Sequence, residues 1–159
     1  MTGTTGRRLE LYCRAETMGR AERRQSVIVE EARALAQADV VDEVVVYEVE
    51  RTPAVGPEGP QDVRAMAAFE EFRTWADEHD TRLHPAFDTR ECYSWEDGRR
   101  YTALVVPVVA LAVYDAEELR GVYPHGRDPH MSVFDGLQAV ERGGLPTPRP
   151  PAGDLVPAE

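Results

Sequence analysis

The 159-residue sequence contains no lysine, and all 18 of its basic residues are arginine. Asp and Glu together number 29, which gives a formal net charge of −11. Carboxylates hold water and cations in concentrated salt, so this composition is typical of a protein adapted to a salt-rich cytosol. In an ordinary protein such a charge argues against nucleic-acid binding, which needs clustered cations, whereas in a salt-adapted protein this argument is weaker. The one cluster is Arg20, Arg23 and Arg24, and we interpret it as the solvated start of a helix.

Long apolar runs are also missing. No stretch approaches the ~20 apolar residues that a membrane-spanning helix needs. The opening residues "MTGTTGRR" contain no apolar segment of the kind found in a signal peptide. We therefore expect a cytoplasmic protein that makes no membrane contact.

Motifs for catalysis, metals and cofactors are absent as well. The chain has no G-x-S-x-G elbow, no glycine-rich phosphate loop and no zinc-type spacing of Cys and His. His125, Asp128 and His130 lie close together in sequence, and we interpret them as polar residues that cap a turn. Pairs of carboxylates are expected as solvated faces in so acidic a chain. The sequence thus predicts no catalytic residues, no metal and no cofactor.

The only two cysteines are Cys13 and Cys92, and they form no C-x-x-C motif. Cys13 alternates with Leu9 and Leu11 in a strand-like segment, which indicates a buried core thiol. Cys92 is the candidate for a regulatory thiol. An enzyme that uses one of these thiols alone for redox chemistry is an alternative function.

Hydrophobic periodicity predicts one domain over residues 8–143, between a disordered N-terminus (1–7) and a disordered tail (144–159) that holds five prolines. The tail's prolines prevent it from packing. The predicted order is strand, helix, strand, helix, an extended piece at 82–101, two strands and a last helix capped by Ser132 and Asp135. The corresponding ranges are 8–15, 20–39, 42–50, 60–80, 108–114, 119–123 and 132–143.

This order resembles the thioredoxin fold, an α/β fold of order β-α-β-α-β-β-α. The resemblance is sharpest at "VVPVVALAVYDAEELRGVYPHG", where Pro107 precedes an apolar strand, a turn, and a strand with a late glycine. Thioredoxin-like proteins carry a cis-proline at this place, so the resemblance implies a cis bond at Val106–Pro107. A proline at a strand's entry is tolerated because no central ladder bond is lost. A ferredoxin-like α+β sandwich is the alternative fold.

The resemblance also implies a binding groove. The family's two redox cysteines lie after the first strand, where this chain has Thr17, Met18, Gly19 and Arg20, so the scaffold would be redox-inactive. These residues would line a groove with Val106 and Pro107, whose loop would offer an unpaired backbone edge to a protein or peptide partner. We therefore expect a non-catalytic binding or regulatory module.

Three further segments resemble a family of small haloarchaeal proteins labelled as helix-turn-helix domain-containing. They are "FRTWADEHDTRLHPAFDTREC", "YTALVVPVVALAVYD" and "SVFDGLQAVERGG". That label implies a transcriptional regulator, the second alternative function. The predicted helices alternate with strands, so the pattern itself predicts no helix-turn-helix, which needs two adjacent helices. The sequence leaves the partner and the oligomeric state open.

Overall fold

A computed structural model describes residues 6–49, 54–55, 63–83, 86–93, 95, 98, 100–126 and 131–143. The predicted disordered tail at 144–159 and most of the predicted N-terminal one lie outside these residues, and the first strand begins at Arg7. None of the described helices is long and apolar enough to cross a membrane.

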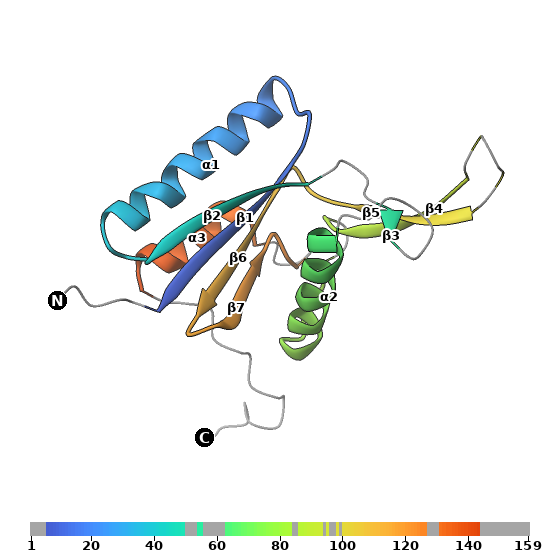
Figure 1. The fold of residues 1–159 in the computed structure, drawn as a ribbon. Helices are drawn as coiled ribbons and strands as arrows, with labels where there is room; N and C mark the ends of the chain where they lie inside the picture. The colour runs from blue at the N-terminus through green and yellow to red at the C-terminus, as the bar shows by residue number, and fades with distance from the viewer. Residues whose placement is uncertain are drawn as a thin grey trace.

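A four-stranded sheet forms the centre of the fold (Figure 1). Its strands are β1 (Arg7–Arg14), β2 (Glu43–Val49), β6 (Val109–Asp115) and β7 (Glu118–Tyr123), in the order β2-β1-β6-β7. β1 pairs in parallel with β2 and antiparallel with β6, and β6 pairs antiparallel with β7. The sheet is therefore mixed, with β1 and β6 inside it and β2 and β7 at its edges.

Helices cover both faces of this sheet (Figure 1). α1 (Arg20–Gln37) and α3 (Val133–Glu141) pack on one face, and α2 (Val63–Glu78) packs on the other. The predicted order of helices and strands is confirmed. The ferredoxin-like alternative is wrong, because that sandwich holds its helices on one face of the sheet only.

The chain also forms a second, smaller sheet. It contains β3 (Ala54–Val55), β4 (Asp88–Tyr93) and β5 (Arg100–Val105) in the order β3-β5-β4. β4 and β5 form an antiparallel hairpin that projects away from the central sheet (Figure 1). The extended conformation predicted near 82–101 is thus confirmed for the hairpin strands, whereas β3 was not predicted.

Alternation along β1 sends its side chains into two cores. Leu9 and Leu11 are fully buried against α1 and α3, and Tyr12 is buried against α2. The helices supply matching apolar stripes at helical spacing. The stripes are Ile28, Ala32 and Leu35 from α1; Val133, Leu137 and Val140 from α3; and Ala68, Phe72, Trp75 and Ala76 from α2.

The predicted cis bond at Val106–Pro107 is wrong. Among the described residues the cis peptide bond is Tyr123–Pro124, so Val106–Pro107 is trans. Pro107 lies two residues before β6 begins, as expected for a proline at a strand's entry. The apolar pattern around Pro107 does not distinguish cis from trans, because the missing N–H of proline loses no hydrogen bond of the sheet in either isomer. Trans is the favoured isomer of X-Pro bonds.

The last helix begins as its sequence predicts. Ser132 Oγ accepts a hydrogen bond from the backbone N–H of Asp135 at 3.2 Å, and Asp135 Oδ2 accepts one from the N–H of Ser132 at 2.8 Å. This reciprocal capping box satisfies two N–H groups at the helix end. One turn further on, Gly136 lies directly against the ring of Tyr123 on β7. A β-carbon at Gly136 would lie 2.7 Å from Cγ and Cε1 of that ring.

We expect Gly136→Ala to lower the free energy of unfolding by about 1–2 kcal/mol. Overpacking against a ring this close should cost about 2–3 kcal/mol, the upper part of the usual range, and the better helix propensity of alanine returns about 1. Denaturant unfolding measures the difference. Gln138→Ala, on the exposed face of the same helix, is the control and should change stability by less than about 0.5 kcal/mol. A Gly136→Ala protein as stable as the wild type would show that α3 does not approach β7 this closely.

Candidate functional site

The two segments predicted to form a groove lie side by side at the end of β1. The backbone N–H of Arg14 donates to the carbonyl of Val108 at 2.9 Å, and the N–H of Ala15 donates to the carbonyl of Val49 at 2.7 Å. The loop at 15–19 therefore leaves the sheet beside the residues that precede β6. This loop continues directly into α1, so the end of β1, the start of α1 and the residues before β6 meet here.

Gln25 holds this junction together from the second turn of α1. Its Nε2 donates to two carbonyls, that of Arg14 at 2.9 Å and that of Val108 at 2.7 Å. Its Oε1 accepts a bond from the hydroxyl of Thr17 at 2.8 Å. One amide side chain thus joins the end of β1, the loop and the residues before β6. Sequence reasoning missed Gln25, because a single glutamine on a polar helix face gives no signal.

The structure does not leave the Val106 loop as open as predicted. The carbonyl of Val106 accepts a bond from Arg14 Nη1 at 3.4 Å, and the Val106 side chain is buried. Val106 and Pro107 line an apolar cavity on the α2 side of the sheet, together with Tyr12, Phe72 and other core residues. The cavity measures about 20 Å³, which is room for one water molecule at most. The groove therefore lacks the cis-proline on which its prediction rested, and this cavity is too small for a peptide.

The other predicted groove residues lie at the start of α1, on its exposed side. Met18 is 81% exposed, Arg20 is exposed, and Gly19 has no atom within 4 Å of its β-carbon position. Gly19 caps the helix without a side-chain hydrogen bond, so the first N–H groups of α1 face outward unsatisfied by a cap. The helix dipole and the arginines at 20, 23 and 24, all exposed, make this end of α1 positive within an acidic molecule.

Cys13 lies on the face of β1 that packs against α1 and is half-buried. Burial, and next the negative charge of Glu48, raise the pKa of its thiol above the ordinary value. A nucleophilic thiol needs a lowered pKa, so the surroundings of Cys13 oppose that role. The side chain of Cys92, on β4, lies outside the described residues.

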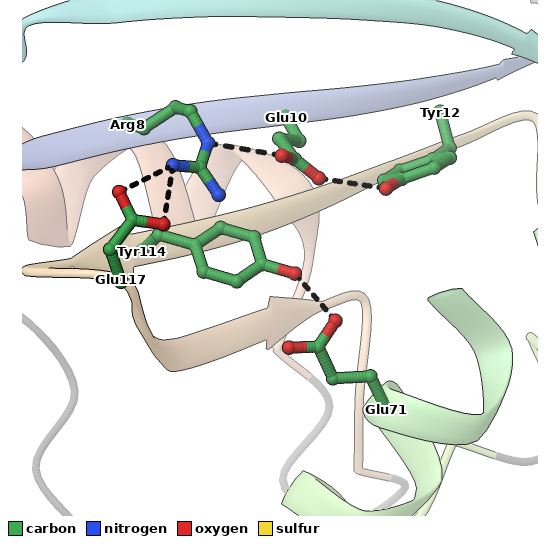
Figure 2. Close-up of polar contacts among 6 residues, drawn as sticks. All are labelled: Arg8, Glu10, Tyr12, Glu71, Tyr114 and Glu117. Carbon is green, nitrogen blue, oxygen red and sulfur yellow. Dashed lines mark hydrogen bonds and ion pairs between the residues drawn. The ribbon is translucent and has the colours of Figure 1, made fainter. Parts of the chain in front are cut away.

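A polar network crosses the opposite face of the sheet, beside α2 (Figure 2). The carboxylate of Glu10, whose residue is only 8% exposed, accepts a bond from Arg8 Nε at 3.0 Å and one from the hydroxyl of Tyr12 at 2.7 Å. Arg8 also reaches Glu117, in the turn after β6, with Nη1 3.3 Å from Oε2. Burial of a carboxylate is tolerated only with such partners.

Tyr114 links the same network to α2. Its ring lies under the guanidinium of Arg8, 4.4 Å from centroid to Cζ, and its hydroxyl donates to Glu71 Oε1 at 2.8 Å (Figure 2). Burial and the neighbouring carboxylates raise the pKa of Tyr114, and also that of Tyr12. Both phenols therefore stay protonated and donate at neutral pH. The network fixes α2 and the β6–β7 turn against β1, which is a structural role.

Two histidines surround Trp75 at the end of α2. The ring of His79 stacks on Trp75 at 4.7 Å, and that of His125 meets it edge-on at 5.2 Å. The other members of the predicted loop group, Asp128 and His130, lie outside the described residues. Within the described part of the chain, no three His, Cys, Asp or Glu side chains are placed to hold a metal ion.

Two aromatic side chains stand exposed on the projecting hairpin. Tyr93, at the end of β4, is 62% exposed, and Trp95, in the connection to β5, is fully exposed. Trp and Tyr are the side chains most often found at the centres of protein interfaces. Periodicity could not find them, because Trp95 lies in a connection that has no face to assign and Tyr93 lies in a segment that was predicted only as extended.

Comparison with known protein families gives a match over most of the chain. The family described as "Helix-turn-helix domain" matches residues 1–144. No curated protein matches the chain, and no solved structure does. Across the described residues, every two successive helices are separated by at least one strand, so this part of the chain contains no two adjacent helices joined by a short turn.

We expect Gln25→Ala to lower the free energy of unfolding by about 1–2 kcal/mol, because two carbonyls lose a donor and each hydrogen bond contributes about 1 kcal/mol net. Gln25→Glu should cost more at pH 7, since a carboxylate would face the same two carbonyls, and it should recover stability as the pH falls and the carboxyl gains a proton. Thermal melts in concentrated KCl measure both effects. Ser26→Ala, exposed on the next position, is the control. Equal stability of wild type and Gln25→Glu at pH 7 would contradict the assigned bonds.

Proposed function

The chain belongs to the helix-turn-helix domain family, and we propose that it is a non-catalytic regulator that contacts DNA through the N-terminal half of α1. The family match over residues 1–144 is the observation that carries this proposal, because it covers the whole described fold.

The start of α1 is the part of the described surface best suited to phosphate. Arg20, Arg23 and Arg24 are exposed over its first two turns, and Glu22 is the only acid among them. Helix N-termini attract phosphate through their free N–H groups and dipole. The second half of the helix carries Glu30 and Glu31 against one arginine, Arg33, so the net charge of α1 is positive only toward the end beside the loop.

The net charge of −11 bears on how such contacts would work. Outside the start of α1 the molecule repels DNA, and only salt that screens this repulsion lets the surfaces approach. Counterion release contributes little to binding in concentrated salt. Affinity there must come from interactions that salt does not weaken, such as hydrogen bonds to base edges and a fit to the shape of the DNA. We therefore propose a short contact by one helix end, without a broad basic surface.

We expect the protein to retain duplex fragments from a random-sequence pool in KCl, and Arg23→Ala/Arg24→Ala to weaken retention at least tenfold. The double variant should also reduce the dependence of log K on log [KCl] by about two, one for each lost phosphate contact. Fluorescence anisotropy over a series of KCl concentrations measures both quantities. Arg33→Ala, exposed near the other end of α1, is the matched control and should bind as the wild type does.

Failure to retain any duplex between low and molar KCl, by a protein that circular dichroism shows to be folded, would overturn this proposal. Binding that is equally weakened by Arg33→Ala would contradict the assignment to the start of α1.

A second candidate is a protein-binding module on a redox-inactive thioredoxin-like scaffold. Apart from the second sheet, the elements follow one another as β1-α1-β2-α2-β6-β7-α3, which is the chain order that the thioredoxin resemblance implies. Thr17, Met18 and Gly19 stand where that family has its cysteines, and the 15–19 loop meets the residues before β6 as the resemblance requires. The exposed Tyr93 and Trp95 supply a partner contact in place of the predicted groove. This candidate predicts no retention of DNA.

A further inference from the structure

The tip of the β4–β5 hairpin carries two aromatic side chains that belong to neither core. Tyr93 is 62% exposed and Trp95 is fully exposed. Arg100 lies opposite Tyr93 on β5, with its Cζ 5.4 Å from the centroid of the tyrosine ring. Trp, Tyr and Arg are the side chains that most often supply the binding energy of an interface. The hairpin tip is therefore a candidate contact surface outside the site at the start of α1.

The hairpin leaves the fold at the end of the sheet where α1 begins. β5 ends at Val105, and three residues later the carbonyl of Val108 accepts hydrogen bonds from the end of β1 and from Gln25 of α1. Figure 1 shows the hairpin and the start of α1 at this same end of the central sheet. A molecule bound at the start of α1 would thus lie on the side of the fold from which the hairpin projects.

The length of the hairpin fits the spacing of the grooves of a DNA duplex. β4 runs over six residues, from Asp88 to Tyr93, so at about 3.3 Å per residue its tip lies ~20 Å from its base. One turn of B-DNA spans ~34 Å, so a minor groove lies roughly 17 Å along the axis from the neighbouring major groove. The major groove is the one that admits an α-helix. A duplex that α1 contacts in its major groove therefore presents a minor groove within reach of the hairpin tip.

We propose that the hairpin tip enters the minor groove of the DNA that α1 contacts, and that Trp95 inserts there against a base step. This inference rests on the proposed function and adds a second contact to it. Proteins that bind the minor groove place arginine in it and insert large apolar side chains between base steps. Arg100 and Trp95 have these two chemistries, and the bases offer aromatic faces on which an indole ring stacks.

The charge of the hairpin tip permits this approach. Residues 92–101 carry as many arginines as carboxylates, namely Arg99 and Arg100 against Glu96 and Asp97, whereas the whole chain carries −11. A stacked ring neutralises no phosphate, so it adds nothing to the salt dependence of binding. Such a contact is what an acidic protein needs in order to hold DNA in concentrated salt.

Fluorescence anisotropy with a duplex that the wild type retains tests this contact. We expect Trp95→Ala to weaken binding at least fivefold at every KCl concentration, without changing the slope of log K against log [KCl]. Trp95→Phe keeps a ring and should recover part of the loss. Val46→Ala removes a 38% exposed apolar side chain from β2 and is the matched control, which should bind as the wild type does. Because Trp95 is fully exposed, its replacement should leave the fold intact.

Tryptophan emission of the wild type gives an independent measurement. Saturating duplex should quench part of this emission, and the quenching should be lost in Trp95→Phe, which keeps only the buried Trp75.

DNA binding by Trp95→Ala as tight as that of the wild type would overturn this inference alone and leave the proposed function standing. The same conclusion would follow from a reduced salt slope in Trp95→Ala, or from wild-type emission that does not change on binding. A folded wild type that retains no duplex would overturn the proposed function together with this inference, and the exposed rings would then face a protein partner.

Discussion

The structure depends on one constraint, which is that alternate side chains of β1 must enter two different cores. β1 lies inside the sheet and is hydrogen-bonded to β2 on one side and β6 on the other. Leu9 and Leu11 hold α1 and α3, whereas Glu10 and Tyr12 face α2. A slip of one residue would exchange these two sets, and would place a carboxylate among the apolar side chains of α1 and α3. Register and helix placement are thus fixed together.

Glu10 is the residue that makes a slip of β1 most unfavourable. A carboxylate that is 8% exposed destabilises the fold unless its oxygens are satisfied, and Arg8 and Tyr12 satisfy them from the same strand. Arg8 and Tyr114 then extend the contacts to Glu117 and Glu71 (Figure 2). The polar network therefore orients the turn after β6 and the helix α2 relative to one strand.

The features of the fold that are set by neighbouring residues could be predicted from the sequence. The three helices and the strands β1, β2, β6 and β7 follow from periodicity, and the cap at Ser132 follows from a four-residue signal. The rest depends on contacts between distant residues. Arg8 and Glu117 lie 109 positions apart, and Gln25 and Val108 lie 83 apart, so no window along the chain contains either contact. The same holds for β3, whose two residues become a strand only by pairing with β5.

The two segments that were predicted to line a groove lie next to each other, whereas the predicted cis bond between them and the strand is wrong. The loop after β1 does meet the residues before β6, because a parallel β1–β2 pair next to an antiparallel β6 brings those chain segments to one end of the sheet. The isomer at Pro107 and the bond from Arg14 to Val106 are set by packing that the pattern does not encode. What remains exposed there is the start of α1, with its arginines.

Native-state hydrogen exchange of β1 tests the central claim most directly. If β1 holds both cores in register, the amides from Leu9 to Cys13 should be among the slowest in the protein and should exchange only by global unfolding. Their free energy of exchange should then equal that of denaturant unfolding. Exchange of β1 as fast as that of the projecting β4–β5 hairpin, with the helices still protected, would contradict the account.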